Sequence, residues 1–164
     1  MEGNKSNPRA LLVFGAPCSG KTAFSSKFSK KFDLAYYDLA ELKENNHFSH
    51  KTLLLVIELI ARTGKNLIFE GCLDTEKERA EIRNVLRKAG YQPTLVWIQT
   101  DINTIRTRLK LRYRSVAKAR DAYDNSVNNL EAPSEVEKPI ILSGKHTFET
   151  QCKHVLTGLA DVDK

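Results

Sequence analysis

Short runs of apolar residues alternate along the chain with longer segments in which apolar residues recur at helical spacing. A short apolar run bounded by glycine, proline or polar residues predicts a buried strand, whereas apolar residues three or four positions apart predict an amphipathic helix. On this basis we expect five strands, at residues 10–14, 34–37, 66–69, 94–98 and 139–142.

Helices are expected between these strands. The first begins at Gly20, because Phe24, Phe28 and Phe32 recur every four residues and line one face of a helix. Residues 52–63 are apolar almost all round and stop at a glycine, which predicts a buried helix. This apolar run is also too short to cross the hydrocarbon core of a membrane.

Two later helices have recognisable starts. Thr75 and Glu78 match a capping box at the beginning of residues 75–89. Asp101 is a candidate N-cap for the helix after the fourth strand, and a last helix is expected across residues 148–159. Because strands and helices alternate throughout, the pattern predicts an α/β fold in which helices cover both faces of a parallel sheet.

Composition narrows the class of protein. With 164 residues, of which 41% are hydrophobic and 28% charged, the chain has the size and composition of one globular domain spanning residues 1–164. Residues 1–8 are polar and lack the apolar core of a secretory signal, and the three cysteines are widely spaced without a C-x-x-C pair. These features predict a cytoplasmic protein without a membrane anchor, either a monomer or a homodimer.

The first predicted strand leads into a sequence that matches the phosphate-binding pattern G-x-x-x-x-G-K-[ST] and opens a helix. In such a loop, backbone N–H groups and the helix N-terminus face a phosphate, and the lysine neutralises β- and γ-phosphate oxygens. The threonine hydroxyl can hold magnesium. The pattern therefore predicts a site for ATP with Mg²⁺. Its residues are Gly15, Ala16, Pro17, Cys18, Ser19, Gly20, Lys21 and Thr22.

With this loop, the chain resembles the predicted-kinase group of P-loop NTPases, which includes polynucleotide 5′-hydroxyl kinases, zeta-toxin-like kinases and small-metabolite kinases. The resemblance extends over nearly the whole chain, although only the phosphate loop is highly specific. It implies a three-layer P-loop kinase-like fold with strand order 2-3-1-4-5. In that group an aspartate after the second strand activates the acceptor hydroxyl, and an arginine-bearing lid closes over the phosphates.

The resemblance places the acceptor-side carboxylate at Asp38, which ends the second strand. A carboxylate there can accept the hydroxyl proton or orient magnesium, because phosphoryl transfer depends mainly on positioning and charge neutralisation. A helix N-cap is the alternative role, and one residue can serve as both. The family often has an arginine two residues further on, where this chain has Ala40.

Two further residues follow from the same resemblance. Glu70 ends the third strand, where such kinases carry a metal-organising or substrate-binding acid, and acids seldom end a buried strand without a partner. Asp74 is interpreted as a helix cap. Arg79 lies in the next helix, where related kinases bind substrate, and its position is equally consistent with an exposed surface.

The net charge of +6 is concentrated in residues 106–120, which contain basic residues and no acidic ones. The resemblance implies a lid at about residues 106–138, with Arg108 and Arg112 as the first candidates to bind phosphate oxygens through their planar guanidinium groups. A nucleic-acid surface and a solvated basic helix are the alternatives. Residues 143–146 occupy the place where related kinases contact the adenine ring.

Two classes of function remain open. The first is an ATP-dependent kinase that acts on a hydroxyl. Within it, a small-molecule acceptor such as a nucleoside, nucleotide or sugar is favoured over a polynucleotide 5′-hydroxyl, because no aromatic-rich basic stripe is present to stack exposed bases. The second is a regulatory module that binds ATP and phosphorylates nothing.

Overall fold

The computed structural model describes residues 7–162 and contains a five-stranded parallel sheet with the order β2-β3-β1-β4-β5. The predicted fold class and strand order are therefore confirmed. Of the polar residues 1–8, on which the absence of a secretory signal was inferred, residues 1–6 lie outside the described part. The strands are β1 (Arg9–Phe14), β2 (Ala35–Asp38), β3 (Leu67–Glu70), β4 (Gln92–Gln99) and β5 (Ile140–Ser143).

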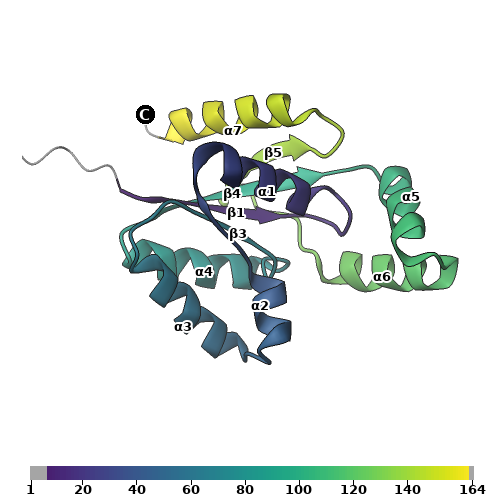
Figure 1. Cartoon of the computed structure of the whole chain (residues 1–164), viewed down its shortest axis with the longest axis horizontal. Helices are drawn as coiled ribbons and strands as arrows, with labels where there is room; N and C mark the ends of the chain where they lie inside the picture. Colours follow the sequence, from purple (N-terminus) through teal and green to yellow (C-terminus); the bar gives the residue numbers. More distant parts are fainter. Residues whose placement is uncertain (1–6, 163–164) are drawn as a thin grey trace, which may run out of the picture.

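Helices cover both faces of the sheet, as Figure 1 shows. One face is covered by α1 (Lys21–Phe32) and α7 (Phe148–Val162), and the other by α3 (His50–Ala61) and α4 (Glu76–Lys88). Because successive strand residues point to opposite faces, each buried strand contributes to two hydrophobic cores. Leu11 and Val13 pack with α1 and α7, whereas Leu12 and Phe14 pack with α3 and α4.

The strand register brings the candidate acids together. Asp38 at the end of β2 is the register partner of Glu70 at the end of β3, and Glu70 is the partner of Val13 in β1. The strands are parallel, so all their carboxyl ends lie at one edge of the sheet, where ligands bind in open α/β folds. The phosphate loop follows β1 at this same edge.

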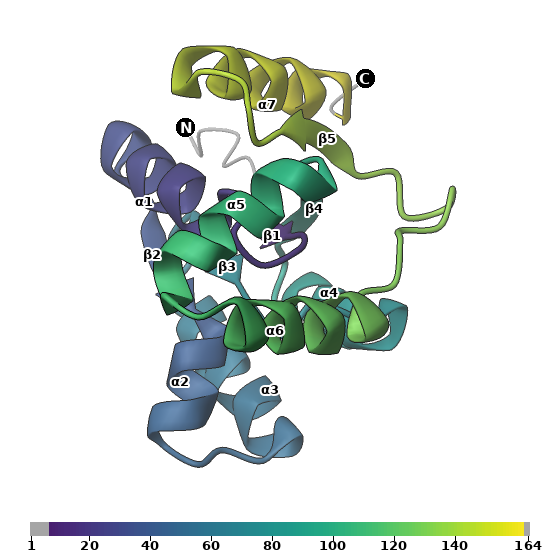
Figure 2. The ribbon, with the colours of Figure 1, turned by 90° about the vertical axis from the view of Figure 1, so that its right-hand side faces the viewer.

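The remaining helices lie near that edge. Figure 2 shows α5 (Ile102–Tyr113) and α6 (Val116–Asn129) in front of the end of the sheet, joined at Arg114 in a left-handed conformation. We call this pair the α5–α6 hairpin, and the chain from 130 to 139 that leads back to β5 the return segment. Residues 106–138, where the resemblance implied a lid, thus contain most of α5, all of α6 and most of the return segment.

Two helices differ from expectation. The expected buried helix, α3, buries only Leu53, Ile57 and Ala61, whereas Leu55 and Leu59 are more than half exposed. The prediction of burial on all sides is wrong, because α3 lies in an outer layer with its second face toward solvent. The pattern of residues 39–45 did not predict the short helix α2 (Leu39–Asn45), although a helix N-cap was the alternative role considered for Asp38. No helix within residues 7–162 is long and apolar enough to span a membrane.

Candidate nucleotide and phosphoryl-transfer site

The phosphate loop requires glycine at its first position. Gly15 has a φ of +146°, and a Cβ atom there would lie 2.3 Å from the carbonyl oxygen of Ile98 in the neighbouring strand β4. Gly20 has a φ of +110° and occupies the N-cap of α1. Both glycines allow backbone that a side chain would strain, so the loop can turn directly from β1 into the N-terminus of α1.

Lys21 lies over the loop that precedes it. Its ammonium group donates hydrogen bonds of 2.9 Å to the carbonyl oxygens of Gly15 and Ala16. Burial lowers the pKa of Lys21, and the nearby carboxylates of Glu70 and Asp74 oppose that shift. The lysine thus combines a desolvated positive charge with flanking acids, as expected of a residue that neutralises bound phosphate.

Glu70 is 4% exposed and has two hydroxyl partners. Thr22 donates to its Oε1 at 2.5 Å, and the hydroxyl of Tyr36 donates to its Oε2 at 3.1 Å. A threonine hydroxyl beside a carboxylate is a set of hard oxygen donors, which fits Mg²⁺. Sequence reasoning missed Tyr36, although it lies two positions before Asp38 and therefore on the same face of β2. Burial raises the pKa of Tyr36, and the Glu70 carboxylate raises it further.

Asp38 caps a helix and lines the cleft at once. Its Oδ1 accepts from the backbone N–H groups of Ala40 at 3.0 Å and Glu41 at 3.1 Å, which makes it the N-cap of α2. The cap holds the carboxylate at the strand end, beside Gly71. A Cβ atom on Gly71 would lie 2.9 Å from the Cβ of Ala40, so these two backbones approach closely where the family often has an arginine.

The candidate arginines of α5 face the same cleft. Arg108 donates from Nη1 to the carbonyl oxygen of Cys18 at 3.0 Å and from Nη2 to that of Gly144 at 3.3 Å. Gly144 is pressed against the phosphate loop, since a Cβ there would lie 2.0 Å from the carbonyl oxygen of Ser19. Arg108 therefore connects the phosphate loop to the loop after β5, in which the sequence placed the adenine contact.

These groups line one cleft with a volume of about 640 Å³. The structure brings Lys21, Thr22, Asp38 and Glu70 together with the two arginines of α5 in the lining of this cleft. The loop after β5 and the start of α7 form a further wall. The lining residues are Pro17, Cys18, Gly20, Lys21, Thr22, Ala23, Phe24, Lys27, Asp38, Glu70, Arg108, Arg112, Gly144, His146, Phe148 and Gln151.

Residues 11–135, which include the phosphate loop, both acids and both arginines, match a protein family described as an AAA domain. The chain belongs to this AAA-domain family. The phosphate loop and the strand order place it among the P-loop kinase-like proteins. A comparison with curated proteins found no match.

Solved structures share the fold of this AAA domain. A gluconokinase from Sinorhizobium meliloti 1021 has a TM-score of 0.73 at 13% identity, with 96% of this chain and 95% of that chain covered. The Mycobacterium tuberculosis APS kinase CysC, in complex with AMPPNP and APS, has 0.69 at 19% identity, with coverages of 94% and 98%. Chaetomium thermophilum Kti12, in complex with ADP-AlF3, has 0.68 at 16% identity, with coverages of 93% and 97%. At these identities the likeness shows a P-loop kinase-like fold.

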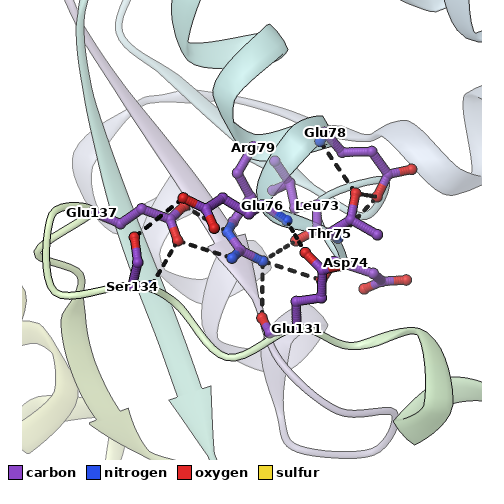
Figure 3. Close-up of polar contacts among 9 residues, drawn as sticks. All are labelled: Leu73, Asp74, Thr75, Glu76, Glu78, Arg79, Glu131, Ser134 and Glu137. Atoms are coloured by element: carbon purple, nitrogen blue, oxygen red, sulfur yellow. Dashed lines mark hydrogen bonds and ion pairs between the residues drawn. The ribbon is translucent and has the colours of Figure 1, made fainter.

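Arg79 and Asp74 of the AAA domain do not have the surroundings that the sequence predicted. Arg79 is not among the residues that line the cleft: its side chain is fully buried and paired with Glu137 of the return segment (Figure 3). This burial matches neither a substrate contact in the open cleft nor an exposed surface. Asp74 is not a cap, because Thr75 is the N-cap of α4 and forms the expected capping box with Glu78. Burial raises the pKa of Asp74.

Proposed function

We propose that this protein is an ATP-dependent phosphotransferase that moves the γ-phosphate of Mg·ATP to a hydroxyl of a small-molecule acceptor. One observation carries the proposal. A phosphate-loop lysine, a hydroxyl-carboxylate pair and a second strand-end carboxylate meet in a single cleft that two arginines of α5 also line. This combination supplies charge neutralisation and a proton acceptor, the two requirements of phosphoryl transfer to a hydroxyl.

The nucleotide half of the reaction uses the phosphate loop. The loop N–H groups and Lys21 bind the β- and γ-phosphates, and Thr22 with Glu70 supplies oxygen ligands for magnesium. Magnesium, when bound, neutralises charge on the phosphate oxygens. The adenine ring lies toward His146 and Phe148, which line the cleft together with Gly144.

The acceptor half uses Asp38. Its carboxylate accepts the proton of the acceptor hydroxyl as that oxygen attacks the γ-phosphorus, and the bond between the γ-phosphorus and the bridging oxygen of ADP breaks. The N-cap hydrogen bonds fix the direction in which the carboxylate points without closing it off from the cleft. Arg108 and Arg112 bind the oxygens of the transferred group as the α5–α6 hairpin closes and excludes water.

The acceptor is a small molecule because the cleft is of the size that encloses one, and part of it is taken by the nucleotide. Basic side chains on the α5–α6 hairpin favour a second candidate, the 5′-hydroxyl of a polynucleotide, whose phosphates they would contact. The two acceptors differ in size and charge, so one screen can separate them.

The test is a screen for phosphorylated product. A metabolite extract supplemented with 5′-hydroxyl oligonucleotides is incubated with Mg·ATP and either the native protein or Lys21→Ala, and the products are identified by mass spectrometry. A species that gains a phosphoryl group only with the native protein establishes a kinase and names its acceptor. If ATP binds and no product forms, the chain is a regulatory module and the proposal fails.

A second variant tests the assigned proton acceptor. Asp38→Asn retains an N-cap side chain of nearly equal strength, so α2 remains intact. We expect ATP affinity to be unchanged and turnover on the identified acceptor to fall by about 100-fold or more, since general-base catalysis contributes on that order. Full turnover of this variant would show that Asp38 is not the proton acceptor.

A further inference from the structure

Arg79 lies near the start of α4 and has no contact with solvent, since its side chain is 0% exposed. Glu137 from the return segment faces it with both carboxylate oxygens. Nε donates to Oε1 at 2.7 Å and Nη2 donates to Oε2 at 2.9 Å (Figure 3). This paired geometry uses the planar fork of arginine, which a lysine cannot reproduce.

The third nitrogen of Arg79 reaches backbone on two different segments. Nη1 donates to the carbonyl oxygens of Leu73 at 3.2 Å and Asp74 at 3.1 Å, and to that of Glu131 at 3.0 Å. The guanidinium carbon also lies 4.8 Å from the ring centroid of Phe14, the last residue before the phosphate loop. One side chain therefore contacts the end of β1, the loop between β3 and α4, and the return segment.

Further bonds join the same two segments beside Arg79. The N–H of Glu131 donates to the carbonyl oxygen of Asp74 at 2.8 Å, and the N–H of Glu76 donates to the Glu131 carboxylate at 2.6 Å. Ser134 donates from its backbone N–H to Glu137 at 3.0 Å and from its hydroxyl to Glu76 at 3.3 Å. The return segment is thus held against the start of α4 by neutral and charged hydrogen bonds.

Both segments lead to the cleft. The loop between β3 and α4 follows Glu70, the last residue of β3, whose carboxylate accepts the Thr22 hydroxyl, and it begins with Gly71 beside Asp38. The return segment directly follows α6 of the α5–α6 hairpin, and α5 of that hairpin carries Arg108 and Arg112. The loop starts at the strand end that presents Glu70 to Thr22, so bonds that fix the loop also help to fix the geometry of the proposed site.

We propose that Arg79 is a positioning residue that couples the α5–α6 hairpin to the loop that follows Glu70, so that nucleotide binding in the cleft is transmitted to the return segment. The inference rests on the proposed function, because it concerns turnover in the same cleft. Arg79 itself touches neither nucleotide nor acceptor. It acts through the loop carbonyls and through Glu137.

A purely structural role is the competing explanation, and an apolar replacement separates the two. Exchanging a buried ion pair for apolar residues of similar size is often neutral for stability or stabilising, because no buried charge is left unpaired. The double variant Arg79→Met/Glu137→Leu therefore keeps a packed interior while it removes every hydrogen bond from the guanidinium to the loop. The matched control is Glu58→Gln/Arg62→Gln, which removes a largely exposed ion pair on α3.

The first measurement compares kcat with KM on the acceptor that the screen identifies. We expect the double variant to unfold in urea at a midpoint near that of the wild type and to bind Mg·ATP with unchanged KM. Its kcat falls by about 100-fold, the order of loss expected when a catalytic group is misplaced by about 1 Å. The control retains wild-type kcat. A double variant with wild-type stability and wild-type kcat overturns the inference.

The second measurement needs no turnover. Hydrogen exchange of the Glu76 and Glu131 amides reports on the contact directly, because each donates across it. In the wild type, Mg·ATP slows exchange at these amides as well as in the phosphate loop. In the double variant only the phosphate loop responds. The coupling is overturned if Mg·ATP does not change the exchange rate of these amides in the wild type, or if it slows their exchange in the double variant as much as in the wild type. Either result leaves the proposed function intact.

A phosphate loop that shows no response to Mg·ATP overturns the proposed function instead, and the inference with it. If the double variant does not fold, Arg79→Lys replaces it, since lysine retains the charge opposite Glu137 but not the fork. The same separation of kcat from KM is expected of Arg79→Lys. A lysine variant with normal kcat would contradict the inference.

Discussion

The cleft and the Arg79 cluster are two assemblies of charged groups that lie close together and differ in access. Lys21, Asp38 and Glu70 all line a cleft of about 640 Å³, and Lys21 is bonded only to its own loop among the described contacts. Arg79 and Glu137 are 0% and 6% exposed and are bonded through all three guanidinium nitrogens. One assembly faces a cavity, and the other faces only protein.

The difference teaches how to tell a binding charge from a structural one. A charge in a cleft can exchange its partners for a ligand, whereas an enclosed charge with every donor satisfied has no remaining capacity for one. Residue type alone does not distinguish them, since arginine occurs in both settings here. The two assemblies should therefore respond to substitution in opposite ways.

The largest loss of stability is expected when only one partner of the buried Arg79–Glu137 ion pair is replaced. Arg79→Met leaves Glu137 buried without its partner, and we expect the free energy of unfolding to fall by about 3–5 kcal/mol. Urea denaturation measures the change, with Arg62→Met as the control on an exposed pair. A loss no greater than that of the control would show that the two assemblies do not differ as described.

A loss of ligand binding rather than of stability is expected from Lys21→Met. Burial already disfavours the charged form of Lys21, so we expect the free energy of unfolding without nucleotide to change by less than about 1 kcal/mol. The wild type should gain about 2.7 kcal/mol at a nucleotide concentration of about 100 times Kd, and the variant should gain none. Thermal unfolding with and without Mg·ATP checks both values.

Low pH should reduce the stability that the Arg79 cluster contributes to the folded protein. Burial raises the pKa of Glu137, but hydrogen bonds from Arg79 and Ser134, together with the positive charges of Arg79 and Arg83, outweigh burial and hold the pKa below its ordinary value of 4.5. The folded chain thus binds this proton less readily than the unfolded chain. The stabilisation is complete above the unfolded-state pKa and is lost as the pH falls through the lower folded-state pKa.

The measurement is thermal unfolding between about pH 6 and about pH 3, which spans the usual range of carboxyl pKa values. We expect the stability advantage of the wild type over Glu137→Gln to shrink as the pH falls through this range. An advantage that stays constant across it would show that Glu137 does not carry the acid dependence.

A small loss of stability is expected at Asp38, whose carboxylate is the N-cap of α2 and also lines the cleft. Asp38→Ala should lower the free energy of unfolding by about 1 kcal/mol through loss of the cap, and Asp38→Asn should lower it by much less. Both variants should lose turnover. Urea denaturation measures the stability of both variants. Equal stability would mean that the N-cap contributes nothing and that Asp38 acts only as part of the cleft.

Local pattern predicted the features that depend on neighbouring residues. The phosphate loop, the cap at Asp101 and the capping box of Thr75 and Glu78 are each encoded within a few positions, and the alternation of strands with helices is periodic. The short helix α2 was missed because of its seven residues only Leu39 is buried, which leaves no periodic signal. Helix α3 was interpreted as fully buried because hydrophobicity does not reveal which layer is outermost.

Contacts between segments far apart in the sequence could not be predicted from the pattern of residues. Glu137 lies 58 positions from Arg79 in a polar stretch without a periodic pattern, and no spacing rule connects them. Tyr36 and Glu70 are separated by 34 positions and meet only because β2 and β3 are neighbours. Such pairs are fixed by strand register and by the path of the return segment, which exist only after the chain has folded.

The stacked rings of Phe14 and Trp97, next to the start of the phosphate loop, provide an intrinsic fluorescent probe. Trp97 is the only tryptophan in the chain, and its ring lies parallel to that of Phe14 with centroids 6.1 Å apart and an angle of 7°. Phe14 immediately precedes Gly15 and also carries the Arg79 guanidinium over its ring. Indole emission excited in the ultraviolet therefore arises from one known position, and we expect its intensity and wavelength to report changes at the start of the phosphate loop without an added dye.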